Sequence, residues 1–184
     1  MKLLFISLGC DKNLVDSEEM LGMLAADGHE IIDDEDEAEV IIVNTCCFIG
    51  DAKEESVNTI LEMAEKKKAG TCKVLIVTGC MAQRYKKEIS EEIPEVDAIL
   101  GTTSYGDISK AVKEAQAGRH FEEYKSIDFL PDISGKRMLT TGGHFAYLKI
   151  AEGCDKHCTY CIIPKLRGSY RSVPMEQLVK EARS

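Results

Sequence analysis

The sequence predicts an α/β protein whose first part is an open parallel sheet flanked by helices. Over residues 1–118, short apolar runs rich in Val and Ile alternate with longer helical patterns. Such strand–helix alternation is typical of a parallel sheet covered on both faces. Of the 184 residues, 44% are hydrophobic and 30% are charged, so the chain can bury one core and the beginning of a second.

Five strands are predicted in this first domain. Leu3–Leu8, Val40–Val43 and Val74–Val77 are continuous apolar runs, which indicates strands that are buried on both faces. Glu30–Ile32 and Ala98–Leu100 show a weaker form of the same pattern.

Four helices are predicted between and after these strands. They cover roughly Val15–Ala26, Asp51–Lys68, Tyr85–Glu92 and Asp107–Ala117. In the second of these helices, apolar residues three and four positions apart share one face, while Glu and Lys lie opposite. That helix therefore has an apolar side suited to packing on the sheet.

The alternation stops after Gly118, and the charge changes at the same place. Residues 1–118 contain 12 Lys and Arg against 24 Asp and Glu, whereas residues 119–184 contain 11 against 8. We therefore expect a domain boundary there, followed by an interdomain connection over residues 119–139 that includes Pro131 and Gly135. The acidic first domain argues against general nucleic-acid binding and favours a basic partner.

Residues 140–184 are predicted to begin a second domain without completing it. A strand is expected at Ala146–Ile150 and a helix at Met175–Arg183, with Pro174 suited to the first helical turn. Because this domain is only begun, we expect the chain from about Thr140 to dock loosely or to depend on further sequence.

The sequence indicates a cytoplasmic protein with reduced cysteines. The apolar stretch Leu3–Leu8 is too short for a signal core of ~7–15 residues, and no run approaches the ~20 residues needed to span a bilayer. The eight cysteines are clustered as metal ligands are, which favours thiolates over disulfides.

Three cysteines near the end of the chain, Cys154, Cys158 and Cys161, form a C-x-x-x-C-x-x-C pattern. Three thiolates on one short loop can hold three corners of a cubic iron–sulfur cluster and leave the fourth iron open to a ligand. The alternative is a structural zinc ion, which needs a fourth ligand. His157 is the nominal candidate, but its position beside Cys158 makes joint ligation awkward.

Three further cysteines, Cys10, Cys46 and Cys80, each lie within three residues of the end of a predicted strand. Since ligands of an open parallel sheet collect beyond the carboxyl ends of its strands, these thiols are expected to converge and hold a second cluster. The alternative is three buried cysteines that act as small apolar residues. Cys72 lies at the opposite end of its strand, and Cys47 is expected to point away from its neighbour, so neither is predicted to be a ligand.

These motifs resemble a known family over essentially the whole chain. The loop from Cys154 to Cys161 is similar to the signature loop of radical S-adenosylmethionine enzymes. The segments Leu-Gly-Cys-Asp-Lys-Asn-Leu-Val-Asp-Ser-Glu, Asn-Thr-Cys and Gly-Cys-Met-Ala-Gln-Arg-Tyr resemble the amino-terminal domain of the methylthiotransferases. The first segment and Ile-Pro-Lys-Leu-Arg-Gly-Ser-Tyr-Arg-Ser are similar to the ribosomal-protein branch of that family. Cys47 departs from the pattern, because that branch commonly has Gly there.

The resemblance implies two 4Fe–4S clusters, S-adenosylmethionine, and methylthiolation of an aspartate β-carbon in a small-subunit ribosomal protein. One cluster would lie at Cys154, Cys158 and Cys161 and generate the radical, with Tyr160 against the adenine. The other, at Cys10, Cys46 and Cys80, would deliver sulfur. An electron donor of unknown identity is also implied, whereas neither a membrane nor a nucleic acid is expected as a partner of this chain.

The same resemblance implies that the family continues beyond residue 184, through a partial barrel of which only the first β/α unit is present here. We therefore expect the 184 residues alone to be inactive. Two loop arginines, Arg167 and Arg171, are expected to be solvated, the alternative being contact with a cofactor carboxylate or the substrate. The alternatives that stay open are the tRNA-modifying branch of the family and a non-catalytic module that binds iron–sulfur or zinc.

Overall fold

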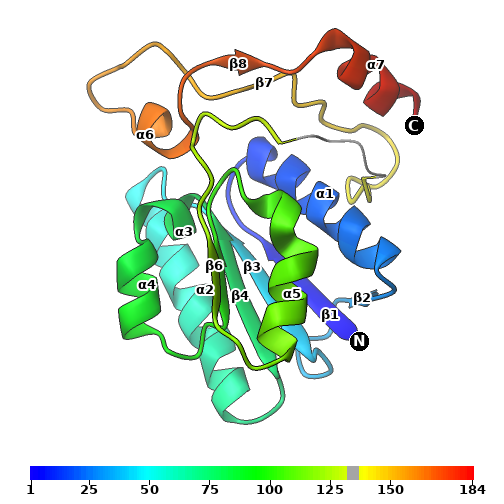
Figure 1. The fold of residues 1–184 in the computed structure, drawn as a ribbon, viewed down its shortest axis with the longest axis vertical. Helices are drawn as coiled ribbons and strands as arrows, with labels where there is room; N and C mark the ends of the chain where they lie inside the picture. Colours follow the sequence, from blue (N-terminus) through cyan, green and yellow to red (C-terminus); the bar gives the residue numbers. More distant parts are fainter. Residues whose placement is uncertain (132–136) are drawn as a thin grey trace.

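The computed structural model describes residues 1–131 and 137–184. Within these residues, six strands form one sheet in the order β2-β1-β3-β4-β5-β6, and all neighbours are parallel (Figure 1). The strands are β1 (Lys2–Ser7), β2 (Glu30–Ile32), β3 (Val40–Thr45), β4 (Val74–Gly79), β5 (Ala98–Leu100) and β6 (Phe121–Glu123). The predicted fold class of the first domain and its five strands are confirmed.

Helices cover both faces of this sheet (Figure 1). One face packs on α1 (Asp11–Ala26) and α5 (Ile108–Gln116), and the other on α2 (Gly50–Lys68), α3 (Cys80–Arg84) and α4 (Lys86–Glu92). Alternate side chains of β3 enter the two cores, so that Ile42 lies in the first and Ile41 in the second, both fully buried. Burial of each such side chain stabilises the fold by roughly 1.5–3 kcal/mol, which explains the continuous apolar run Val40–Val43 in β3.

Two features of the first domain differ from the sequence prediction. Strand β6 lies inside residues 119–139, which were predicted to be a connection, and it pairs with β5 through Ala98 and Phe121. The short helix α3 was not predicted, because its five residues are too few to show a periodic pattern. It begins directly after β4, where Gly79 has a φ of 94° and turns the chain. Of the predicted connection, Gly135 lies outside the described residues.

The second segment contains β7 (Ala151–Glu152), α6 (Ile163–Arg167), β8 (Arg171–Ser172) and α7 (Met175–Arg183). The helix predicted at Met175–Arg183 is confirmed, but the strand predicted at Ala146–Ile150 is wrong. Only the two residues that follow it pair, antiparallel with β8. Before β7 the backbone is held by single contacts instead, such as Arg137 Nη2 donating to Tyr147 O at 2.6 Å.

This segment lies across the edge of the sheet at which the strands end (Figure 1). Leu166 of α6 is 2% exposed and belongs to the core formed with α2 and α3. The Thr102 hydroxyl, just after β5, donates to Leu166 O at 2.7 Å. The expectation of loose docking is therefore wrong for the part that carries α6, because apolar burial and buried hydrogen bonds fix it to the first domain.

Replacing Gly79 with Ala is expected to destabilise the protein by more than about 2 kcal/mol. A positive φ costs a non-glycine residue roughly 1–2 kcal/mol, and an added Cβ would also lie 2.5 Å from Thr45 O and overlap Asn44 Oδ1. Gly28→Ala is the matched control, since Gly28 has a φ of 84° with nothing within 4 Å. Urea denaturation measures both, and equal losses for the two variants would contradict the steric argument.

Candidate metal centre

The sheet-edge cysteines, Cys10, Cys46 and Cys80, follow three adjacent parallel strands. The register pairs Ser7 with Asn44 and Asn44 with Thr78, so β1, β3 and β4 end at the same level. Cys10 precedes α1 as its N-cap, Cys46 follows β3, and Cys80 is the first residue of α3. Cys46 and Cys80 are buried, whereas Cys10 is exposed. The three thiols thus come from one edge of the sheet.

The turn before Cys10 passes very close to Cys46. Gly9 has a φ of 97°, and a Cβ added there would lie 2.6 Å from Cys46 Cβ and 2.9 Å from Cys46 Sγ. Only glycine fits this approach, because any side chain would collide with the thiol. Ser56 fixes Cys46 from the other side, where its hydroxyl donates to Cys46 O at 2.8 Å and accepts from Cys46 N at 3.0 Å.

Asn13, in the first turn of α1, joins the three strand ends. Its Nδ2 donates to Leu8 O and to Thr45 O, both at 2.9 Å. Its Oδ1 lies 3.9 Å from Cys80 Sγ. Burial raises the pKa of the Cys80 thiol to about 11, and the nearby Arg167 guanidinium opposes that rise. The amide of Asn13 therefore sets the spacing of the edge at which these cysteines lie.

The loop cysteines, Cys154, Cys158 and Cys161, lie between β7 and α6. Cys158 is exposed and the other two are half-buried. Cys154 N donates to Gly168 O at 3.1 Å, and Cys161 N donates to Cys158 O at 3.0 Å. His157 adopts a φ of 46°, which bends the loop tightly between the first two cysteines.

A cleft of about 430 Å³ is lined by the loop, including Cys158 and Cys161, and by the start of α6. Phe48 and Arg84, which follow Cys46 and Cys80 by two and four residues, also line it. Tyr160 lines this cleft with 87% of its surface exposed, so it takes no part in core packing. The cleft thus contains two loop cysteines and is reached from the sheet edge by the segments that follow Cys46 and Cys80.

The donor chemistry of these residues suits iron–sulfur clusters. Among the described residues, no three His, Cys, Asp or Glu side chains are arranged to hold one metal ion. A cubic cluster makes a different demand, because each cysteine binds a separate iron and the sulfurs stay farther apart than the ligands of a single ion. Two groups of three thiols fit soft thiolate-bound metals.

Of the two remaining cysteines, Cys72 lies far from the predicted ligands, whereas Cys47 lies near Cys80. Cys72 is buried just before β4, at the opposite end of the sheet from Cys80, and its Sγ lies 3.0 Å from Val74 O. Cys47 is 3% exposed and belongs to the core on the α2 side of the sheet, which also includes Cys80. Burial raises the pKa of the Cys47 and Cys72 thiols, as it does that of Cys80, so acidity does not separate them from the predicted ligands.

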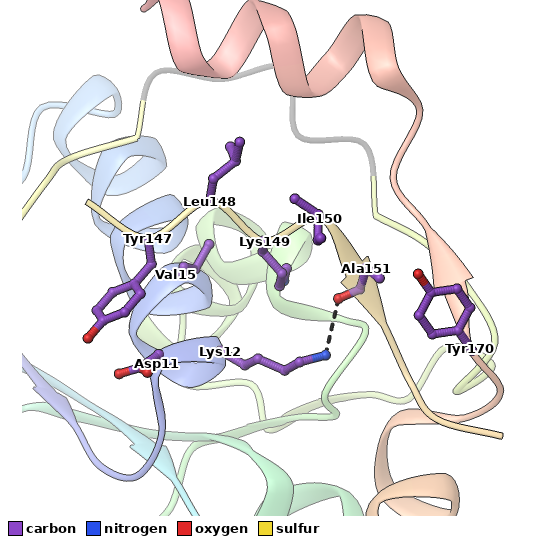
Figure 2. A pocket seen from close by; sticks show the side chains of 9 residues that line it. All are labelled: Asp11, Lys12, Val15, Tyr147, Leu148, Lys149, Ile150, Ala151 and Tyr170. Atoms are coloured by element: carbon purple, nitrogen blue, oxygen red, sulfur yellow. Dashed lines mark hydrogen bonds between the residues drawn. The ribbon is translucent and has the colours of Figure 1, made fainter. Parts of the chain in front are cut away.

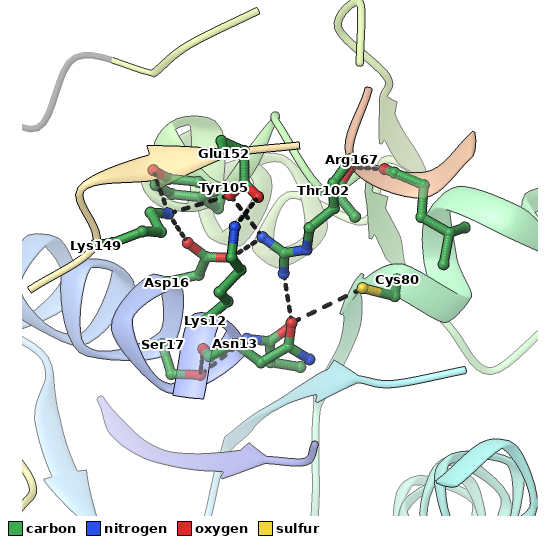
Figure 3. A network of polar contacts seen from close by, with 12 residues as sticks. Lys12, Asn13, Asp16, Ser17, Cys80, Thr102, Tyr105, Lys149, Glu152 and Arg167 are labelled. Atoms are coloured by element: carbon green, nitrogen blue, oxygen red, sulfur yellow. Dashed lines mark hydrogen bonds and ion pairs between the residues drawn. The ribbon is translucent and has the colours of Figure 1, made fainter. Parts of the chain in front are cut away.

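A buried network of charges joins the first domain to the second segment (Figure 3). Arg167 Nη1 lies 3.0 Å from Asp16 Oδ2 and 2.8 Å from Glu152 Oε2. Lys149 pairs with Asp16 and lies 3.6 Å from Glu152. All four side chains are at most 6% exposed. Two carboxylates and two cations thus neutralise one another where water is excluded.

The pKa values follow from this arrangement. Burial opposes the charge of Glu152, but Arg167 and Lys149 outweigh it and lower the pKa of Glu152 to about 2. The pKa of Lys149 is raised, since Asp16 and its other acidic neighbours overcome the cost of burial. Burial outweighs the attraction of Lys149 and raises the pKa of Glu19 to about 7. Glu19 therefore changes charge near neutral pH.

The prediction that the two loop arginines are solvated is wrong. Arg167 is 2% exposed and sits inside the charge network. Arg171 is half-buried, and its Nη2 donates to Ile127 O at 2.9 Å and to Arg167 O at 3.1 Å. The physical reason is that carboxylates from α1 and β7 meet at the sheet edge and require cations there.

Figure 2 shows how the stretch before β7 lies along the first turns of α1, around a pocket of about 330 Å³. Lys12 Nζ donates to Ala151 O at 3.1 Å and lies 3.2 Å from Glu152 Oε1. Tyr147 and Tyr170 line the pocket mouth. These contacts hold the strand that leads into the loop cysteines against the helix that follows Cys10.

Sequence reasoning did not assign a role to Asn13, Asp16 or Glu19. All three are buried on α1 although they are polar. Their spacing of three residues was the available signal, because it places them on one face of a helix. That face points to the second segment, and its polar character predicts polar partners rather than an apolar core.

An open parallel sheet with chemically active residues gathered beyond its strand ends defines a class of α/β proteins that bind ligands at this edge. Residues 2–101 match the family described as "Uncharacterized protein family UPF0004". The chain belongs to this family.

Among the curated relatives of this chain are several proteins that share one name. The ribosomal protein uS12 methylthiotransferase RimO of Lachnoclostridium phytofermentans is 64% identical over 183 residues, which cover 100% of this chain and 42% of that protein. The proteins of the same name from Clostridioides difficile and Geobacter sulfurreducens are 52% and 50% identical, and each alignment covers 100% of this chain and 41% of the relative. The chain thus spans about two fifths of these relatives. Its resemblance to the amino-terminal part of the ribosomal-protein branch is confirmed.

None of the described helices is long and apolar enough to cross a membrane.

In the unchanged protein, the free energy of unfolding is expected to fall as pH rises, because Glu19 becomes charged. Glu19→Gln is expected to abolish this fall. The raised pKa of Glu19 means that the neutral form is favoured in the folded state, so its stabilisation is complete below pH 4.5 and is lost as pH rises through about 7. The loss amounts to at most about 3 kcal/mol. Urea denaturation between pH 5 and 8 measures this loss of unfolding free energy. Glu88→Gln, at an exposed position of α4, is the control. Parallel pH profiles for Glu19→Gln and the unchanged protein would contradict this assignment.

Proposed function

We propose that the protein carrying this chain transfers a methylthio group to the β-carbon of an aspartate in a small-subunit ribosomal protein. The observation that carries the proposal is the cleft lined by loop cysteines and by Phe48 and Arg84, from the segments that follow Cys46 and Cys80. A reaction that needs a radical and a sulfur atom at one carbon requires two sites that face a shared space. The relatives named as uS12 methylthiotransferases support the same reaction and substrate.

In this proposal the loop cysteines, Cys154, Cys158 and Cys161, hold one 4Fe–4S cluster, and the sheet-edge cysteines, Cys10, Cys46 and Cys80, hold the other. When bound, these clusters and S-adenosylmethionine supply a radical that removes hydrogen from the substrate and the sulfur that replaces it. The residues of the chain orient the reactants. The exposed Cys158 leaves its side of the loop open to a ligand, and Tyr160 offers an aromatic face to an adenine at the cleft.

The same proposal covers the second segment and the cell compartment. Residues 140–184 would be the first β/α unit of a radical S-adenosylmethionine barrel, which further sequence completes. The 184 residues alone would not turn over, because most of the barrel that encloses the substrate is missing. A cytoplasmic location follows from a ribosomal substrate and from reduced cysteines, and an electron donor is required for each radical.

Anaerobic reconstitution of the chain with iron and sulfide is expected to yield about eight iron atoms per chain, as two cubic clusters require. The triple variant Cys10→Ala, Cys46→Ala, Cys80→Ala and the triple variant of the loop cysteines should each retain about half. Cys72→Ala is the matched control and should retain all, since Cys72 lies at the far end of the sheet. Iron analysis and absorbance near 400 nm, where thiolate-bound clusters absorb, provide the measurement. A loss of iron in Cys72→Ala, or none in either triple variant, would disprove the ligand assignment.

The reconstituted full-length protein is expected to form 5′-deoxyadenosine and to add a methylthio group to the ribosomal protein, whereas the 184 residues form neither. Mass spectrometry of the ribosomal protein and of tRNA, offered separately, measures the substrate. Modification of tRNA in place of the protein would assign the chain to the other branch of the family. Robust 5′-deoxyadenosine from the 184 residues would contradict the proposed need for further sequence.

A further inference from the structure

We propose that Arg167 is a positioning residue that holds the loop cysteines in register with the sheet-edge cysteines. The inference rests on the proposed function for its catalytic meaning, while the contacts that carry it belong to the chain itself. The guanidinium comes from the end of α6 in the second segment, and its partners include two side chains of α1 in the first domain (Figure 3).

Both nitrogens at the end of the guanidinium are engaged. Nη1 lies 3.0 Å from Asp16 Oδ2 and 2.8 Å from Glu152 Oε2. Nη2 donates to Asn13 Oδ1 at 2.5 Å. The planar guanidinium presents its donors in fixed directions, so these bonds set the orientation of α6 as well as its distance from α1. A lysine would supply the positive charge but not donors held in fixed directions by a planar group.

The partners of Arg167 border both groups of cysteines. On the loop side, Glu152 precedes Cys154 by two residues, and Arg167 itself follows Cys161 by six. One guanidinium therefore ties together the two ends of the segment that carries the loop cysteines. Any shift of this segment along the sheet edge would break the bond to Glu152 or the bond to α1.

On the sheet side, the contact runs through Asn13. Its Oδ1 accepts from Arg167 and lies 3.9 Å from Cys80 Sγ, while its Nδ2 donates to Leu8 O and Thr45 O. Asn13 is fully buried, so its amide has no water to take over these bonds. Loss of Arg167 would free the amide that sets the spacing of the sheet-edge cysteines.

Arg167 also supplies a buried positive charge beside the sheet edge. Removing it leaves the carboxylates of Asp16 and Glu152 with Lys149 as their remaining buried cation. Buried carboxylates without a cation are strongly unfavourable. A cation near an iron–sulfur cluster stabilises the reduced, more negative form, so its removal makes reduction harder.

The first test uses hydrogen–deuterium exchange on the full-length protein freed of metal by a chelator. In Arg167→Met, amides of 150–153 and 171–173 are expected to exchange at least about tenfold faster, as are those of 10–16, because a broken buried ion pair loosens both sides. Arg167→Lys should restore part of the protection. Lys180→Met, which removes an exposed cation of α7 in the same segment, should leave exchange unchanged.

The second test measures what a purely structural role would not change. In a full-length protein whose loop cysteines are replaced by Ala, the reduction potential of the remaining cluster is followed by redox titration with electron paramagnetic resonance. Arg167→Met is expected to shift this potential to lower values, and Arg167→Lys to shift it less. Lys180→Met again serves as control.

Unchanged exchange at both 150–153 and 10–16 in Arg167→Met would overturn the positioning role. A potential that is the same in Arg167→Met and in the unchanged protein would overturn its effect on the sheet-edge site. If no cluster forms on the sheet-edge cysteines in any variant, the proposed function fails, while the exchange measurement still decides whether Arg167 fixes the segment. The two failures are therefore distinguishable.

Discussion

The parallel direction of all six strands is the constraint on which the rest of this structure depends. Because each strand runs the same way, every loop that leaves the end of a strand emerges at one edge of the sheet. The three sheet-edge cysteines, Cys10, Cys46 and Cys80, therefore lie at that edge. The second segment docks on the same edge, where Leu166 enters the core. An antiparallel sheet would have sent alternate strand ends to opposite sides and separated these thiols.

The polar groups at this edge have to be matched because the second segment excludes water from them. Asp16 and Glu152 would be costly to bury as separate charges, and Arg167 and Lys149 bring the cations that neutralise them. The ion pairs of Asp16 with Arg167 and Lys149 connect the first domain to the second segment. The charge network therefore specifies which surface of α1 the segment covers, in addition to the apolar contact of Leu166.

Most of the first domain was predictable because its signals are local. The continuous apolar runs of β3 and β4 indicate buried strands, and the position of each cysteine relative to a strand end indicates the edge. Strand β6 was not predictable in the same way, since Phe121–Glu123 is short and polar and pairs only because β5 offers an open edge. Arg167 looks like an ordinary loop residue until its carboxylate partner Asp16, 151 positions away in α1, is known.

The two groups of cysteines differ in how firmly the backbone holds them. Cys80 begins a helix immediately after a central strand, with no intervening loop, so its thiol belongs to the rigid framework of the sheet. Cys158 sits on an exposed loop with few backbone bonds. In the proposed function, an incoming cluster would meet the exposed Cys158 directly, whereas at the sheet edge Cys10 is exposed and Cys46 and Cys80 are buried. The proposed function thus gives the two groups of thiols different access during assembly.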